Sequence, residues 1–114
     1  MEEADDKVPA ARLMAALQSY QAIIGALAQP DWKMENYRAA ADLLLQMHRA
    51  ATGLPWLHAE WLEVHISHFE FTQALWELRA AAKGLDWLVQ RHARHEGALE
   101  RLRLRCEQPD ARRG

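Results

Sequence analysis

Helix-breaking residues divide this chain at regular intervals, and their spacing constrains its fold more than any other feature. Pro9 lies near the start, Pro30 follows a run rich in Ala and Leu, Gly53 precedes Pro55 by two residues, and Gly84 interrupts the last third. Proline is favoured in the first turn of a helix, and glycine is favoured just past its end. The pattern therefore predicts four helices, over about 8–29, 32–52, 55–83 and 87–106, with Asp31 and Asp86 as the N-caps of the second and the fourth.

The turns between these stretches are short, and short turns place successive helices antiparallel to one another. We therefore expect an all-α fold, a small antiparallel bundle of about four helices. The 50% content of hydrophobic residues, with only 5 Gly and 4 Pro, agrees with helix over strand. The bundle is expected to form one domain over 8–106, between a mobile acidic tail at 1–7 and a mobile tail at 107–114. A domain this short buries only part of its apolar surface, so we also expect a homodimer.

Charge and the ends of the chain limit the classes of partner. The net charge of −2 gives no reason to expect direct binding to nucleic acid or to an anionic membrane. Four of the first six residues are acidic where a signal peptide needs basic ones, and no apolar run approaches the roughly 18 residues that span a bilayer. The single cysteine, Cys106, has no second cysteine to pair with, which favours a reducing compartment. These features predict a cytoplasmic protein without membrane contact.

The third predicted helix differs from the others because its apolar band covers roughly 240° of the helix circumference at about 100° per residue. A surface helix usually buries a stripe of about 100° or somewhat more. One side of the band consists of Leu57, Val64, His68, Phe71, Leu75 and Leu78. The adjacent side consists of Trp61, Leu62, His65, Ile66, Phe69 and Trp76.

Two interpretations of this band stay open. In the first, the helix is the centre of the bundle and is flanked on both sides within one chain. In the second, the mainly aliphatic side forms the core and the aromatic side contacts another chain, either a partner protein or a second copy. We favour the second interpretation, because aromatic residues are enriched at protein interfaces and the chain is too short to enclose a helix fully.

The other three helices each show one apolar face. The first face consists of Leu13, Leu17, Tyr20, Ile24 and Leu27; the second of Met34, Tyr37, Ala41, Leu44, His48 and Ala51; the fourth of Leu88, His95, Leu99 and Leu102. The fourth helix also carries a basic stripe of Arg91, Arg94, Arg101 and Arg105. Because no nucleic-acid recognition motif accompanies it, we expect this stripe to pair with the acidic stripe of the third helix, Glu60, Glu63, Glu70 and Glu77.

The six histidines raise the question of a metal site. His65 and His68 form one pair spaced i, i+3, and His92 and His95 form another. If the third and fourth helices turn near Gly84, the numbers of facing residues add up to about 168, which places His68 opposite position 100. The two pairs are then too far apart to share one ion. We therefore expect no metal and no cofactor.

Nucleophilic chemistry has equally little support. The only serines, Ser19 and Ser67, lack the Gly-rich elbow of a hydrolase. Cys106 lies at the end of a helix, where the helix dipole raises the pKa of a thiol. The sequence therefore predicts a protein that is not an enzyme.

Part of the chain resembles a known family of regulators. Gly53-Leu54-Pro55 is followed by His58, Trp61-Leu62-Glu63, His68, Ala74-Leu75 and Gly84, and this stretch is similar to the second half of small quorum-sensing antiactivators of the TraM and QslA types. The resemblance covers roughly 35–85. It implies a helical dimer that sequesters a transcriptional regulator of the LuxR type and keeps it from DNA. The five tryptophans and the arginine-rich fourth helix depart from the TraM pattern.

A second family is similar over the first half. A helix that carries a tyrosine, then Pro30-Asp31-Trp32, then another amphipathic helix, resembles the flagellar export chaperones of the FliT class. This resemblance implies binding to an export substrate. Both families cover the surface of a protein partner, so either one predicts a binding protein.

Overall fold

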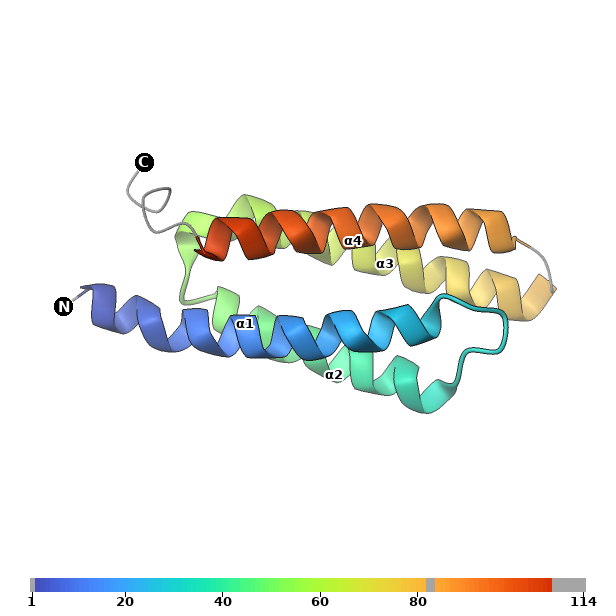
Figure 1. Ribbon diagram of the computed structural model, residues 1–114, viewed down its shortest axis with the longest axis horizontal. Coiled ribbons are helices and arrows are strands. Elements are labelled where there is room, and N and C mark those ends of the chain that lie inside the picture. Colours follow the sequence, from blue (N-terminus) through green and yellow to red (C-terminus); the bar gives the residue numbers. More distant parts are fainter. Residues whose placement is uncertain (1, 82–83, 108–114) are drawn as a thin grey trace.

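The computed structural model describes residues 2–81 and 84–107 of the chain. Four α-helices follow one another, with one turn of 3₁₀ helix, η1, before the third (Figure 1). Their bounds are α1 Glu2–Leu27, α2 Met34–Ala51, η1 Pro55–Leu57, α3 His58–Ala81 and α4 Leu85–Glu107. No strand occurs in these residues, which confirms the all-α bundle of about four helices.

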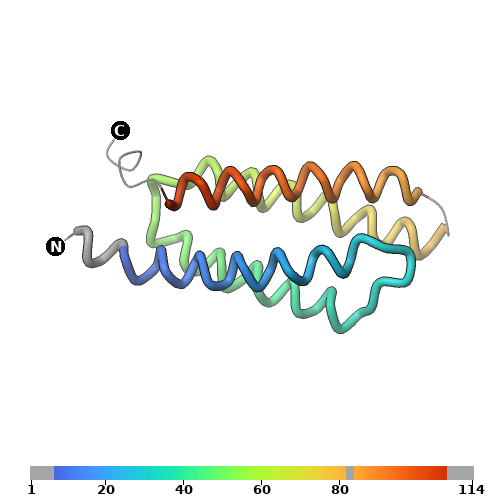
Figure 2. The backbone as a smooth tube through the Cα atoms, in the orientation of Figure 1, coloured from blue at the N-terminus to red at the C-terminus, as the bar shows by residue number. Residues whose placement is uncertain are grey.

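The four helices form two antiparallel hairpins that lie side by side, α1 with α2 and α3 with α4 (Figure 1). The turn between α1 and α2 lies at the same end of the bundle as the end of α3 and the start of α4, and the connection from α2 to α3 lies at the other end (Figure 2). The helices of one hairpin approach each other more closely than helices of different hairpins do. The position of one hairpin on the other therefore depends on side chains in the core.

The breakers act largely as expected. α1 ends at Leu27, before Pro30, and Pro55 opens η1, which leads into α3. Gly84 has a φ of +93°, in the left-handed region that glycine enters without a steric penalty. Residues 108–114 of the predicted C-terminal tail lie outside the described residues, and Glu107 is the last residue of α4.

The predicted start of the first helix is wrong. α1 begins at Glu2 and not near Pro9, so residues 2–7 of the predicted tail are helical and Pro9 lies inside the helix. Proline removes one backbone hydrogen bond, and this loss is smallest close to a helix end. The Pro9 ring also lies over Gly53, where an added Cβ would be 3.5 Å from its Cβ and Cγ atoms. The contact ties the first turns of α1 to the end of α2.

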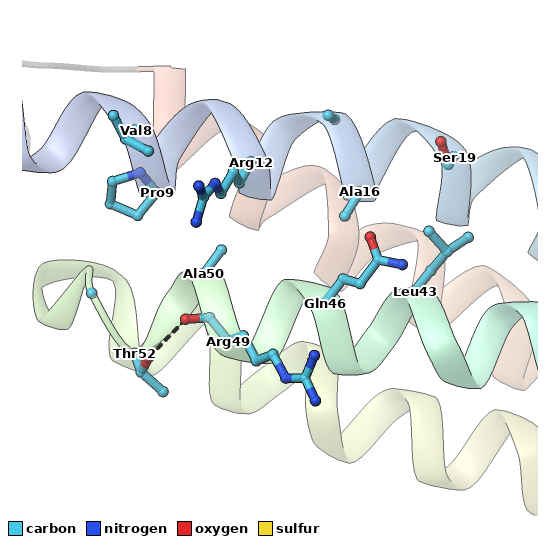
Figure 3. A pocket seen from close by; sticks show the side chains of 12 residues that line it. Val8, Pro9, Arg12, Ala16, Ser19, Leu43, Gln46, Arg49, Ala50 and Thr52 are labelled. Carbon is cyan, nitrogen blue, oxygen red and sulfur yellow. Dashed lines mark hydrogen bonds between the residues drawn. The ribbon is translucent and has the colours of Figure 1, made fainter.

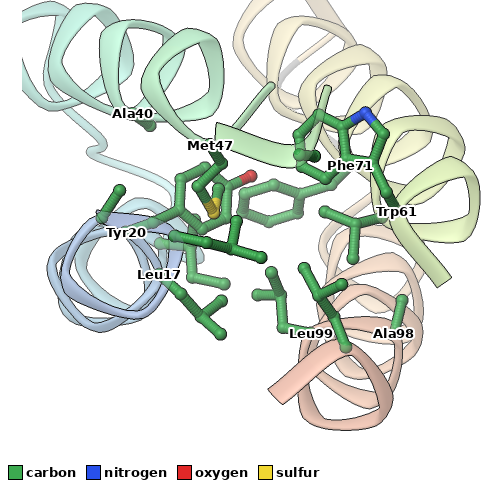
Figure 4. Close-up of a cluster of buried hydrophobic side chains, with 14 of the residues drawn as sticks. Leu17, Tyr20, Ala40, Met47, Trp61, Phe71, Ala98 and Leu99 are labelled. Atoms are coloured by element: carbon green, nitrogen blue, oxygen red, sulfur yellow. The ribbon is translucent and has the colours of Figure 1, made fainter. Parts of the chain in front are cut away.

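The predicted core faces of α1 and α4 are confirmed, because every residue of both faces is fully buried. In Figure 4, Leu17 and Tyr20 of α1, Phe71 of α3 and Leu99 of α4 converge on the same interior. On α3, Leu57, Val64, Phe71, Leu75 and Leu78 are buried as expected, and His68 is half-buried.

The predicted face of α2 is partly wrong. Ala41 and His48 are exposed, and the buried residues of this helix are Ala40, Met47, Ala50 and Ala51. The small alanines let α2 lie close to α1, so α2 turns its alanine and methionine side to the core. The apolar stripe that contains Ala41 and His48 is left at the surface.

Trp32, in the turn between α1 and α2, closes one end of the bundle. Its side chain is 2% exposed, and its indole N–H donates to the backbone oxygen of Leu75 at 3.1 Å. The guanidinium of Arg79 lies 3.5 Å from the centre of the Trp32 ring and donates to the Trp32 backbone oxygen. These contacts fasten the turn of the first hairpin to α3 of the second.

No helix among the described residues is long and apolar enough to cross a membrane.

We predict that Trp32→Ala lowers the free energy of unfolding by about 3–5 kcal/mol, because it leaves a large cavity where the two hairpins meet. Chemical denaturation followed by circular dichroism measures this. Trp87→Ala is the matched control, because the Trp87 side chain is 37% exposed and little packing is lost on its removal. Equal losses for the two variants would contradict the role of Trp32.

Candidate partner-binding surface

The outer side of α3 presents a stripe of large apolar side chains to solvent. Exposed fractions are 47% for Leu62, 51% for Ile66, 72% for Phe69 and 42% for Trp76. Their spacing of three or four residues, with Gln73 between Phe69 and Trp76, keeps them on one side of the helix. Large apolar side chains that gather in this way, and are not scattered singly, are typical of a binding surface.

The structure places five of the six predicted interface residues at the surface, since His65 is exposed as well. The prediction that Trp61 belongs to the exposed side is wrong. Its side chain is only 5% exposed and points into the core (Figure 4). The Trp61 ring contacts the rings of His48 and His65, with centroids 5.8 Å and 6.3 Å away. Trp61 therefore supports the surface from below and is not itself presented to a partner.

α2 extends this surface with Leu45 and with three residues that the sequence had assigned to the core. Leu45 is 46% exposed; of the three, Ala41 and His48 are exposed and Leu44 is half-buried. Together with His65 they line a pocket of about 380 Å³. A neighbouring pocket of about 300 Å³ lies against Trp61 and Leu62 and shares His48 and His65 with the first. The two pockets form one shallow groove between α2 and α3.

We call this surface the α2/α3 face. It consists of Ala41, Leu44, Leu45, His48, Leu62, His65, Phe69 and Trp76. At one end the rings of Tyr37 and Trp76 are 5.6 Å apart and close the groove. His48 and His65 are the only titratable members of the face. Its chemistry is therefore apolar and aromatic, with two imidazoles.

Ion pairs border the face on the side of α4. Arg91 and Arg94 both lie 3.6 Å from Glu70, and Arg101 lies 2.8 Å from Glu63. Arg105 and Glu60 form a further pair at 3.8 Å. The predicted pairing of the basic stripe with the acidic stripe is thus confirmed for these residues. Exposed pairs of this kind add little stability, but they keep both stripes occupied with each other.

Beneath the face, a chain of buried polar groups joins three helices. The hydroxyl of Tyr20, from α1, lies 2.5 Å from Nδ1 of His68 on α3 and 2.5 Å from Nε2 of His95 on α4. Nδ1 of His95 lies 2.5 Å from the hydroxyl of Ser67, which donates to the backbone oxygen of Val64. Tyr20 and His95 are fully buried.

The directions of these hydrogen bonds follow from Ser67. Because its hydroxyl donates to Val64, it accepts from the N–H at Nδ1 of His95, which leaves Nε2 of His95 to accept from Tyr20. The tyrosine oxygen then accepts from Nδ1–H of His68. Every link is satisfied when both imidazoles are neutral.

Burial keeps the imidazoles of His68 and His95 neutral. It lowers the pKa of His68 to about 4, with a further lowering from His65. Burial, then the neighbouring His68 and His92, lower the pKa of His95 to about 3. Burial also raises the pKa of Tyr20 above its ordinary value.

The predicted separation of the two histidine pairs is wrong, because the hydrogen bonds through Tyr20 bring His68 and His95 together. The rings of His68 and His95 lie 5.8 Å apart, and those of Phe71 and His92 lie 5.5 Å apart. The numbers of these facing residues, 68 with 95 and 71 with 92, add up to 163 and not to about 168. The centre of the α3–α4 hairpin therefore lies closer to Ala81, the last described residue of α3, than to Gly84.

The geometry offers little for catalysis. Ser67 is 5% exposed and already donates within its own helix, so this buried hydroxyl is not accessible to a substrate. Among the side chains that the structure describes, no three His, Cys, Asp or Glu come together as a metal site.

A larger groove than these two lies elsewhere, between α1 and α2 (Figure 3). It has a volume of about 550 Å³ and contains small side chains, such as Ala16 and Ala50, together with Arg12 and Arg49. Among the side chains that the structure describes, no histidine, cysteine or carboxylate lines it.

Comparison of the chain with models of protein families, with curated proteins and with solved structures finds no match. The two family resemblances accordingly stay predictions.

The buried histidines predict a loss of stability in mild acid. In the unfolded chain a histidine titrates near pH 6.5, whereas the folded chain holds the pKa values of His68 and His95 at about 4 and about 3. Between these limits the unfolded state binds more protons, so the free energy of unfolding falls as pH falls from about 6.5 to about 4. Two histidines give a slope of up to roughly 2.7 kcal/mol per pH unit. Urea denaturation at several pH values measures this slope of the free energy of unfolding.

A His95→Gln variant should show about half of this slope, since one of the two histidines is gone while an amide can still hydrogen-bond to Ser67. A free energy of unfolding that stays constant from pH 7 to pH 5 in the wild-type chain would show that the two imidazoles are not held neutral.

Proposed function

We propose that this chain is a non-enzymatic regulatory protein that binds another protein through the α2/α3 face and holds it inactive. The observation that carries the proposal is the continuous run of exposed apolar side chains over two helices, from Leu45 to Phe69 and Trp76. In a domain of this size, leaving a phenylalanine 72% exposed has a cost in solubility, which a bound partner removes.

The shape and chemistry of the face support a helical segment as the bound element. Two neighbouring helices with a shallow apolar groove between them are suited to a third amphipathic helix, which inserts residues spaced at i, i+3 or i+4 and i+7. The rim carries charged residues and the centre does not, as in interfaces with a dry core and a polar edge.

The partner class comes from the resemblance to quorum-sensing antiactivators. We propose a transcriptional regulator of the LuxR type, which a homodimer of this chain would keep from DNA. Sequestration needs only a tight and well-placed surface. It fits a chain in which the buried polar groups of Tyr20, His68, His95 and Ser67 are hydrogen-bonded to one another.

The test is an affinity capture from the native host, with mass spectrometry to identify what is bound. Three proteins are compared: the wild type, Phe69→Asp and Val89→Asp. Val89 on α4 is the matched control, because it is 54% exposed and lies away from the α2/α3 face. We expect the wild type and Val89→Asp to capture the same regulator and to reduce its DNA binding in a mobility-shift assay.

Phe69→Asp should weaken capture by at least tenfold, because a charged group replaces an apolar anchor. Equal capture by Phe69→Asp and the wild type would rule out the α2/α3 face. An export substrate in place of a regulator would support the chaperone class, and stoichiometric zinc or iron in the purified protein would support a metalloprotein.

A further inference from the structure

The groove between α1 and α2 has the lining of a site for a small amphiphile, and we propose that it binds the anion of a medium-chain fatty acid. The carboxylate of the ligand lies against Arg12 and Arg49, and its alkyl chain lies along the small apolar side chains between the two helices. No residue of the α2/α3 face lines this groove, so the site is separate from the surface assigned to the protein partner.

Small residues at the contact between the two helices create the groove. Ala16 of α1 and Ala50 of α2 form its floor, and each is only 6% exposed. Their methyl groups cannot fill the space between two helices, and Ala15 and Gly53 at the edges add no bulk. The resulting volume of about 550 Å³ lies within the range of roughly 300–1,000 Å³ that is usual for small-molecule sites.

Both arginines lie at one level of the groove. An added Cβ on Gly53 would be 3.5 Å from the ring of Pro9, so the numbers of facing residues in these antiparallel helices add up to about 62. Arg12 is therefore level with position 50, one residue or ~1.5 Å of rise from Arg49. Figure 3 shows Arg12 pointing from α1 into the groove, toward Ala50, and places Arg49 on the side of α2.

The two guanidinium groups have no counter-charge of their own. Within the part of the chain that the structure describes, no ion pair or hydrogen bond is recorded for the side chain of Arg12 or Arg49, whereas Arg91, Arg94 and Arg101 of α4 all pair with glutamates. A guanidinium can donate two parallel hydrogen bonds to one carboxylate, which makes arginine well suited to this headgroup. Arg12 is the main contact, because Arg49 lies in the last turn of α2, where the helix dipole offsets part of its charge.

The carboxylates of the same two helices lie at a distance from this pair. Asp42 accepts a hydrogen bond from Gln46 at 2.9 Å and precedes Arg49 by seven residues, or ~10 Å of rise. On α1, Asp6 precedes Arg12 by six residues, or ~9 Å of rise, and Asp5 lies one residue further away. The level of the two arginines is therefore locally positive, and it complements a single anionic headgroup.

The remainder of the lining selects an aliphatic tail. From the level of Arg12 the groove runs past Ala15 to Ser19, which faces Leu43, over seven residues or ~10 Å of rise. Among the described side chains no aromatic ring lines it, so a flat ring would have no stacking partner there. A flexible chain of methylene groups fits a narrow floor of methyl groups. One carboxylate with a tail of this length is a medium-chain fatty acid.

The experiment is isothermal titration calorimetry of the full chain with sodium decanoate, at concentrations below micelle formation. We expect saturable binding at one site per chain. Butyrate carries the charge without the tail, and decyltrimethylammonium carries the tail with the opposite charge. Both should bind at least about tenfold more weakly than decanoate, because each lacks one of the two contacts. Equal binding of decanoate and decyltrimethylammonium would overturn the proposal.

Amide chemical shifts measured by NMR locate the bound decanoate. Shifts are expected along 8–19 of α1 and along 43–53, and not around Phe69 and Trp76 of α3. Shifts confined to Phe69, Trp76 and their neighbours would show that the tail binds the α2/α3 face instead, and would overturn the site proposed here.

Charge reversal at the groove tests the two arginines. Arg12→Glu should weaken decanoate binding by at least about tenfold, and Arg49→Glu by about threefold. Arg38→Glu is the matched control, because it makes the same change in net charge at an exposed residue of α2 that does not line the groove. Its dissociation constant should stay within about twofold of the wild type. Equal weakening by Arg12→Glu and Arg38→Glu would show an effect of net charge alone and overturn the site.

A further variant tests the tail and leaves both arginines in place. Ala15 is exposed at the edge of the groove, so Ala15→Trp fills it without disturbing the core. It should weaken decanoate binding by at least about tenfold, with circular dichroism to check that helicity is unchanged. Binding at wild-type strength by a folded Ala15→Trp variant would contradict the placement of the tail.

Cosedimentation with vesicles separates a free fatty acid from a lipid in a membrane. We expect the chain to stay in solution with vesicles of phosphatidylglycerol and with vesicles of phosphatidylcholine. Sedimentation with phosphatidylglycerol that depends on Arg12, without binding of free decanoate, would assign the arginines to a membrane surface and overturn the proposal. Partner capture through Phe69 is measured separately, so the failure of this site leaves the proposed function standing.

Discussion

The hydrogen-bonded chain that runs from His68 through Tyr20 to His95 and Ser67 is the interaction on which the rest of the architecture depends. Each hairpin is held by its own close helix packing, but the two hairpins approach each other less closely. Tyr20 is the side chain of α1 that reaches both α3 and α4 with directional bonds. A buried tyrosine whose oxygen has two imidazole partners fixes one relative position of the hairpins, because any slip leaves a buried polar group without a partner.

That position in turn decides what is left at the surface. With α1 and α4 drawn together through Tyr20 and His95, α2 and α3 meet over Trp61 and at the ring contacts of Tyr37 with Trp76. The groove between α2 and α3 and the exposed Phe69 are consequences of this packing. A side chain in the middle of the core thus determines the shape of a face on the outside.

Much of this could be predicted from the sequence, and the failures have physical reasons. The breakers and the apolar spacing predict four helices, because both act locally. The face of α2 could not be predicted well, because its alanines carry little hydrophobic signal and yet permit the closest approach to α1. The His68–Tyr20–His95 chain was missed because its assembly depends on the register of the α3–α4 hairpin, and a shift of five in the sum of facing residue numbers separates or joins the two imidazoles.

The candidate surface, too, could be predicted from the sequence only in part. Periodicity places Leu62, Ile66 and Phe69 outside the core, since these lie beyond the width that one packed face can cover. It does not separate Trp61 from them, because Trp61 lies at the boundary of the band, and only the position of α2 decides that its ring is covered. A signal that could have found Trp61 is its spacing from Val64, Leu57 and His68, which puts it nearer to the core side than to Phe69.

The composition of the α2/α3 face separates affinity from selectivity. The apolar centre of Leu45, Leu62 and Phe69 is generic and accepts any complementary helix, so it supplies most of the affinity for a partner. Charges at the rim of an interface act mainly on the rate and selectivity of association, so the choice among partners depends on the charged residues around this centre.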